Sequence, residues 1–117
     1  MLKRIDLTRD YKKHQAEYQK AIQEVCEQTA FSGGAFADRF DRQFAQFVGV
    51  PYANGVNNGT SALHCAMLAL GIGEGDEVIV PAFTYIAAAE VALALGLVPV
   101  LVDVDPGTFN IDPEKIE

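Results

Sequence analysis

The chain has 117 residues, which is enough for one domain and too few for two. Half of the residues are hydrophobic, a composition that is typical of globular chains and argues against intrinsic disorder. Sixteen acidic residues against nine basic ones give a formal net charge of −7, which argues against a general nucleic-acid partner. A local anion site is still compatible with this charge, because backbone N–H groups bind phosphate.

The N-terminus and the cysteines indicate a cytoplasmic protein. Residues 1–10 are charged and contain no apolar run, so we expect no signal peptide. No apolar run anywhere reaches the roughly 18 residues that a membrane span needs. Cys26 and Cys65 are too few for a disulfide framework and lie in expected helices. They are predicted to be reduced core thiols.

Two amphipathic helices are expected before residue 50. Residues 10–28 have a weak apolar stripe, and residues 37–48 have a phenylalanine stripe spaced by four, four and three residues. The stripes consist of Tyr11, Tyr18, Ile22 and Val25, and of Phe36, Phe40, Phe44 and Phe47. A flexible loop over residues 31–34 separates the two helices, and Gly49 ends the second one.

The remainder of the chain is predicted to alternate strands and helices. Strands are expected over residues 52–56, 77–80 and 98–104, and nearly all-apolar helices over residues 60–70 and 84–95. Helices without a polar face must be covered on both sides, and continuous apolar strands suit a parallel sheet. The fold class is therefore α/β, with a helical N-terminal segment, 1–49, and a βαβαβ core, 50–117.

The last residues of the chain have the pattern of a helix start. Asp112 suits the N-cap, Pro113 the first helical position and Glu114 the first turn. Because the sequence stops at Glu117, where this helix would continue, we expect the chain to be a fragment of a longer protein.

The first candidate site lies where residues 57–63 join a strand to an apolar helix. Gly59 would allow a ligand to approach the backbone, and Thr60 and Ser61 would present N–H groups and hydroxyls at the helix start. This is the pattern of a phosphate cup. Two alternatives stay open: Thr60 or Ser61 is simply an N-cap, or Asn58 and Gly59 form a hairpin turn, against which the following helix argues. Neither a Walker A loop nor a G-x-G-x-x-G motif is present.

The second candidate site follows the next strand, at residues 81–85. Ligands in open α/β sheets bind beyond the carboxyl ends of strands. Thr84 could cap the next helix, and Tyr85 could offer its ring to a planar ligand. The alternative is a core tyrosine with a satisfied hydroxyl. Other polar residues favour structural roles: His64 a hydrogen-bonded core histidine, and residues 105–107 a turn. No metal-ligand spacing is present.

Four motifs follow one another in the order seen in a known enzyme family. They are NGTSAL at residues 58–63, GIGEGDEVIVP at 71–81, FTYIA at 83–87 and VDVDP at 102–106. With them, nearly the whole chain resembles the DegT/DnrJ/StrS family, including the loop at residues 31–34. Members of this family are pyridoxal 5'-phosphate (PLP) aminotransferases, which mostly act on keto sugars attached to nucleoside diphosphates. Together the motifs are specific to the family, whereas any one alone would not be.

The resemblance implies an aspartate-aminotransferase-like fold, fold type I, of which this chain would be the N-terminal part of the large domain. Gly59, Thr60 and Ser61 match the segment that holds the cofactor phosphate, and Tyr85 matches the aromatic residue that stacks on the pyridine ring. Two departures are Asn57, where serine is frequent, and Ala88, where threonine or serine is frequent. The family's Schiff-base lysine and the aspartate beside the pyridine nitrogen match no residue up to Glu117. We therefore assign no catalytic residue and no metal to this chain.

The resemblance further implies a parent enzyme that transfers an amino group, from glutamate, to a keto sugar nucleotide in amino-sugar, polysaccharide or cell-surface glycan biosynthesis. It implies a homodimer with its sites at the interface, where the loop at residues 31–34 could contribute. Two alternatives stay open. One is a PLP-dependent sugar dehydratase or a cyclitol aminotransferase of the same family, and the other is a stand-alone module that binds a phosphorylated ligand without catalysis.

Overall fold

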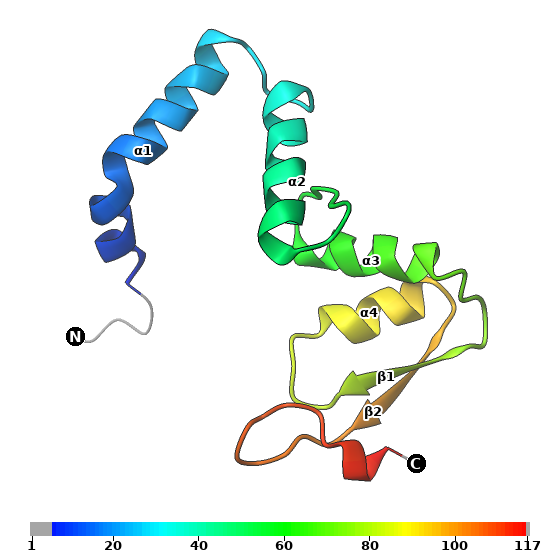
Figure 1. Ribbon diagram of the computed structural model, residues 1–117. Helices are drawn as coiled ribbons and strands as arrows, with labels where there is room; N and C mark the ends of the chain where they lie inside the picture. Colours follow the sequence, from blue (N-terminus) through cyan, green and yellow to red (C-terminus); the bar gives the residue numbers. More distant parts are fainter. Residues whose placement is uncertain (1–5, 117) are drawn as a thin grey trace. The chain divides into compact units, whose positions relative to one another are not determined.

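The structure of the chain, a computed structural model, describes residues 6–116 and divides into two compact units after Gly55 (Figure 1). Lys3 and Arg4, which contribute to the argument against a signal peptide, lie outside the described residues. The first unit is helical, and the second combines helices with a sheet. The segments 1–49 and 50–117, predicted as parts of a larger domain, stay a prediction.

The first unit contains the two helices that the apolar stripes predict. They are α1, Leu7–Glu27, and α2, Ala35–Val48, which is followed by Gly49 in the left-handed conformation (φ 80°). Asp6 begins α1 by accepting a hydrogen bond from the Thr8 N–H at 3.1 Å. The phenylalanine stripe forms one continuous row on α2, with ring centroids 5.7 Å apart for Phe40 and Phe44. The predicted amphipathic helices are therefore confirmed.

The second unit contains two helices and a two-stranded sheet. They are α3, Gly59–Ala69; β1, Glu77–Pro81; α4, Ala87–Ala94; and β2, Val98–Val102. The strands pair in parallel, so the chain must cross over between them through α4. Helix α4 packs on both strands, and α3 packs on α4 (Figure 1). This arrangement confirms the predicted α/β class and the parallel sheet.

One predicted strand does not form. Residues 52–56 are irregular, because a strand needs a neighbour for its backbone groups and the described residues supply none. The Gly55 N–H donates instead to Asp41 Oδ1 of α2, at 2.8 Å. The prediction of a strand over these residues was wrong.

Two further elements are shorter than their sequence pattern suggests. Helix α4 begins at Ala87 instead of residue 84, since the Ala82 N–H donates to the Val102 carbonyl at 2.8 Å and holds the chain on the sheet beyond β1. Strand β2 ends at Val102, and Val104 makes only an isolated antiparallel bridge, to Ile111. The expected helix start at Asp112 is confirmed, as a short 3-10 helix, Pro113–Lys115.

The core of the second unit is small. Met67, Val91, Ala92 and Leu97 form the buried cluster, from α3, α4 and the turn before β2. Cys26 and Cys65 are free, but both are exposed, so the prediction of core thiols was wrong. The reason is that α1 buries no residue and α3 buries only Met67.

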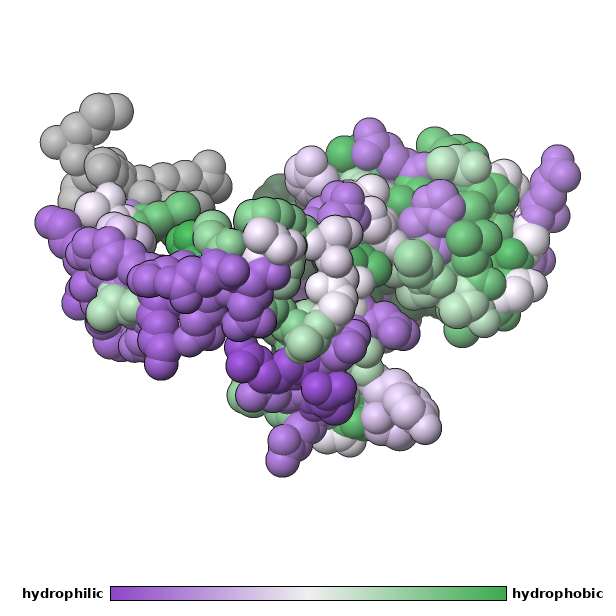
Figure 2. All heavy atoms as spheres, turned by 90° about the horizontal axis from the view of Figure 1, so that it is seen from above, coloured by the Kyte–Doolittle hydropathy of each residue, from purple (hydrophilic) through white to green (hydrophobic). Residues whose placement is uncertain are grey.

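Apolar side chains remain on the surface of both units. Figure 2 shows hydrophobic residues gathered mainly at the right of the face in view, whereas hydrophilic residues dominate the left. Phe47 on α2 is 87% exposed and Leu70 beside α3 is 75% exposed. None of the helices formed by residues 6–116 combines the length and the apolar character that crossing a bilayer requires.

We predict that residues 1–117, produced alone, unfold without a sharp cooperative transition and aggregate at micromolar concentration. The small core and the uncovered apolar faces are the physical reason. Thermal unfolding followed by circular dichroism, together with size-exclusion chromatography, measures this. A monomer that unfolds cooperatively would contradict the prediction and would favour the stand-alone binding module.

Candidate functional site

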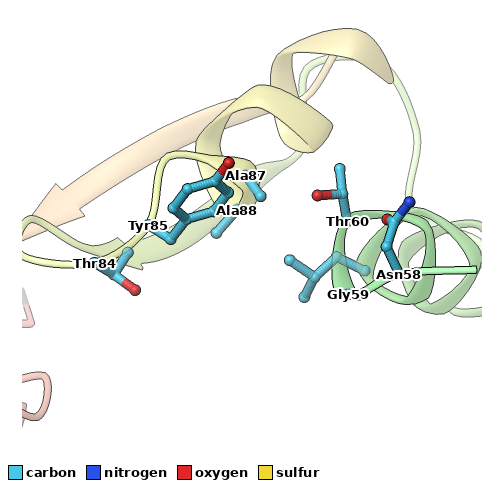
Figure 3. Close-up of a pocket in the computed structure, with 8 residues that line it drawn as sticks. Asn58, Gly59, Thr60, Thr84, Tyr85, Ala87 and Ala88 are labelled. Carbon is cyan, nitrogen blue, oxygen red and sulfur yellow. The ribbon is translucent and has the colours of Figure 1, made fainter. Parts of the chain in front are cut away.

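An open pocket of about 790 Å³ lies between the start of α3 and the segment that leads into α4 (Figure 3). It is lined by Asn58, Gly59, Thr60, Leu63, Thr84, Tyr85, Ala87 and Ala88. The structure therefore brings together three of the four residues that the sequence predicts for the cofactor. The fourth, Ser61, follows directly in α3 but does not line the pocket.

Helix α3 begins with an asparagine cap. Asn58 has extended backbone angles, and its Oδ1 accepts a hydrogen bond from the Ser61 N–H at 2.9 Å. The Asn58 carbonyl accepts from the Ala62 N–H at 3.1 Å, which is the first bond of the helix. Asparagine is among the best N-cap residues, because its short side chain reaches these donors. The alternatives of a Thr60 or Ser61 cap and of a hairpin turn were therefore wrong.

The cap leaves two backbone donors at the mouth of the pocket. The N–H groups of Gly59 and Thr60 belong to the first turn and have no acceptor within residues 6–116. A Cβ added to Gly59 would meet no atom within 4 Å, so a ligand can approach this backbone closely. Figure 3 shows the Thr60 hydroxyl pointing into the space between α3 and Tyr85. These donors, at the positive end of the helix dipole, suit an anion.

Tyr85 forms the opposite side of the pocket. Its side chain is 78% exposed, and its hydroxyl makes no hydrogen bond to any described residue. The alternative of a core tyrosine with a satisfied hydroxyl was therefore wrong. Figure 3 shows the ring beside Ala87 and Ala88, with the pocket in front of it. The ring is free to contact a planar ligand on one face.

Thr84 lines the pocket but does not cap α4. The N-cap of α4 is Ile86, which makes no side-chain hydrogen bond there. The suggestion of a Thr84 cap was wrong, because α4 begins three residues further along the chain than its apolar pattern indicates. Leu63 is a pocket residue that sequence reasoning missed. The available signal was its spacing, since Leu63 follows Gly59 by four positions and such residues share a helix face.

The remaining polar candidates do not form a second site. His64 is half-buried and makes no hydrogen bond within the described residues, so the expectation of a hydrogen-bonded core histidine was wrong. Thr60 and Ser61 precede it by four and three positions on α3, but neither is hydrogen-bonded to its ring. Within residues 6–116, no group of three or more His, Cys, Asp or Glu side chains could hold a metal ion.

Comparison with known proteins identifies the family. The model of the DegT/DnrJ/EryC1/StrS aminotransferase family matches residues 12–117. The chain belongs to this family. Among solved structures, DesV of S. venezuelae, in complex with a ketimine intermediate, is 38% identical with a TM-score of 0.88, over 95% of this chain and 30% of that one. The α/β fold is therefore that of the N-terminal part of a fold type I, aspartate-aminotransferase-like domain.

Curated relatives of this DegT/DnrJ/EryC1/StrS chain are longer proteins. GDP-perosamine synthase of Caulobacter vibrioides is 55% identical over 86 residues, which are 74% of this chain and 23% of that protein. UDP-2-acetamido-2-deoxy-3-oxo-D-glucuronate aminotransferase of Pseudomonas aeruginosa is 40% identical over 117 residues, which are 100% of this chain and 33% of that protein. The chain thus spans no more than a third of the length of either relative.

Proposed function

We propose that this chain is the N-terminal part of a PLP-dependent aminotransferase that transfers an amino group, from glutamate, to a keto sugar nucleotide. The observation that carries the proposal is the pocket, which has the free N–H donors of Gly59 and Thr60 on one side and the exposed ring of Tyr85 on the other. The chain that forms this pocket belongs to an aminotransferase family. The names of the two relatives, a GDP-sugar synthase and a UDP-sugar aminotransferase, support a nucleotide-sugar substrate.

The pocket fits the two parts of PLP. A phosphate monoester needs several donors and a positive potential, which the N–H groups of Gly59 and Thr60 and the hydroxyls of Thr60 and Ser61 would supply at the α3 N-terminus. A planar pyridine ring needs an apolar wall, which Tyr85 would supply by stacking. When bound, PLP supplies the chemistry that takes up and releases the amino group.

The role of this chain in the reaction is binding and orientation. No lysine among the described residues lines the pocket, so none is placed to hold the cofactor covalently. We propose that the Schiff-base lysine and the aspartate beside the pyridine nitrogen belong to the part of the protein that corresponds to later sequence in the family. Leu63, Ala87 and Ala88 give the pocket an apolar lining, which would restrict water around the bound ring.

A dehydratase or a cyclitol aminotransferase of the same family would use the same half of the cofactor site. The residue at the lysine position, and assays with a keto sugar nucleotide and glutamate, distinguish these reactions. We further propose a cytoplasmic location, where thiols stay reduced; Cys26 and Cys65 are free and exposed.

We predict that Tyr85→Ala in the full-length protein weakens PLP binding while the fold is retained. Loss of stacking should cost about 0.5–1.5 kcal/mol, or roughly two- to twelvefold in Kd. Tyr85→Phe is the matched control and should stay close to wild type, because the ring and not the hydroxyl is invoked. Cofactor titration followed by absorbance measures both, and an unchanged Kd in Tyr85→Ala would exclude stacking.

The phosphate assignment predicts a partial loss for hydroxyl removal. Thr60→Ala and Ser61→Ala should each weaken PLP by about 1.5–3 kcal/mol if their hydroxyls bind the phosphate, since the backbone donors remain. Asn58→Asp keeps the cap acceptor but adds a negative charge, whereas Asn58→Ser keeps the cap without one. Of these two Asn58 variants, only Asn58→Asp should lose PLP affinity strongly.

Pyridoxal, which lacks the phosphate, is the ligand control for these variants. Its binding should be nearly the same in wild type, Thr60→Ala and Asn58→Asp, whereas PLP binding should differ. An equal loss for both ligands would place the phosphate away from residues 59–61 and would defeat the assignment.

We also propose that the full-length protein is a homodimer whose sites lie at the interface, with residues 31–34 of one subunit near the site of the other. Gly33 and Gly34 have positive φ values of 61° and 75°, which make this loop conformation accessible. Sedimentation velocity should give a dimer. A fully active monomer would refute the proposal.

A further inference from the structure

The loop after β2 holds an aromatic residue in an unfavourable backbone conformation. Phe109 has φ 59°, in the left-handed region, and within residues 6–116 the only other non-glycine residue with positive φ is Thr29. Bulky residues rarely adopt this conformation, and it persists only where the surroundings enforce it. The conformation therefore requires a structural cause in the neighbouring residues.

Asp105 enforces the conformation of this loop. Its Oδ1 accepts hydrogen bonds from the N–H groups of Gly107 at 3.0 Å and Thr108 at 2.7 Å, which confirms the predicted turn. Its carbonyl accepts from the Phe109 N–H at 2.8 Å, and its own N–H donates to the Asn110 carbonyl at 2.9 Å. The hydrogen bond from Thr108 is the main reason why the pKa of Asp105 is lowered. An aspartate is ionised at neutral pH in any case, so Asp105 accepts these hydrogen bonds as a carboxylate.

The turn directs the Phe109 ring onto Phe83. The two ring centroids are 5.6 Å apart, with an angle of 43° between the ring planes. Both side chains are largely exposed, Phe83 at 68% and Phe109 at 60%, so burial in a core does not explain the contact. The contact joins the loop after β2 to the segment that follows β1.

Phe83 does not line the pocket but directly precedes two residues that do, Thr84 and Tyr85, in a segment with few backbone hydrogen bonds. The Ala82 N–H is bonded to Val102, and the Ile86 carbonyl accepts from the Glu90 N–H. Between them, the backbone groups of residues 83–85 make no hydrogen bond to any described residue. The Phe83–Phe109 contact is therefore an interaction that joins this segment, which includes the pocket residues Thr84 and Tyr85, to a distant part of the chain.

We propose that Phe109 is a positioning residue for the cofactor pocket. Its ring, fixed by the Asp105 turn, holds Phe83 and through it the position of Tyr85. The inference rests on the proposed function, since it assigns to Tyr85 the contact with the PLP ring. Phe109 itself lines no part of the pocket and lies 24 positions after Tyr85 in the sequence.

The test uses the full-length protein with Phe109→Asn, which removes the ring but tolerates the left-handed backbone. In the protein without PLP, brief digestion with chymotrypsin should cut faster after Tyr85, because a segment without backbone hydrogen bonds depends on its side-chain contacts. Cleavage within α3 should be unchanged. Phe109→Tyr keeps a ring and should restore the slower cleavage. Phe83→Leu removes the same contact from its other side, and should reproduce the result if Phe109→Asn does not fold.

Cofactor affinity then shows whether the contact acts through Tyr85. Phe109→Asn should weaken PLP binding by about two- to tenfold, the range expected for one aromatic contact. In a Tyr85→Ala background the same substitution should have no further effect, because the group that it positions is gone. An equal loss in both backgrounds, or unchanged affinity in the single variant, would overturn the proposal.

The two readouts separate this inference from the proposed function. An unchanged rate of cleavage after Tyr85 in both Phe109→Asn and Phe83→Leu overturns the positioning role, whatever the protein binds. Faster cleavage in these variants of a protein whose wild type binds no PLP would support the positioning of this segment and would defeat the aminotransferase proposal alone.

Discussion

The parallel pairing of β1 with β2 is the constraint on which the pocket depends. Parallel strands cannot be joined by a tight turn, so the chain leaves β1, crosses through α4 and returns to the start of β2. This crossover places residues 82–88 at the carboxyl end of the sheet, where α/β proteins bind ligands. Packing of α3 against α4 then brings the first turn of α3 to the same place. These two contacts bring the two sides of the pocket together.

Tyr85 is the one ionisable side chain among the residues that line the pocket. The donors of the pocket are two backbone N–H groups and neighbouring hydroxyls, and its charge complementarity comes from the α3 dipole. Asn58 decides which donors remain, because it uses the Ser61 N–H for its own cap and leaves those of Gly59 and Thr60. The acidic net charge of the chain is therefore compatible with an anionic ligand, since the local backbone field outweighs distant, screened carboxylates.

The expectations that failed share one physical cause. A strand over residues 52–56, buried thiols at Cys26 and Cys65, and a hydrogen-bonded His64 all assume neighbours that residues 6–116 do not supply. The sequence pattern reports which environment a residue suits, whereas the structure reports which environment it has. The two relatives named above are at least three times as long as this chain.

Local sequence by itself determined the helices α1 to α3, the end of α2 at Gly49, the Asp105 turn and the residue types of the site. Each of these depends on interactions within a few positions, such as caps, side-chain periodicity and glycine conformations. The N-cap of α3 was a choice among neighbouring residues, and the structure has Asn58 there. Only the tertiary structure decided that α4 starts at Ala87 and that Phe109 meets Phe83. These features depend on competition among several local options and on contacts between distant segments. Residue spacing along one segment does not encode their outcome, because the decisive partner lies elsewhere in the chain.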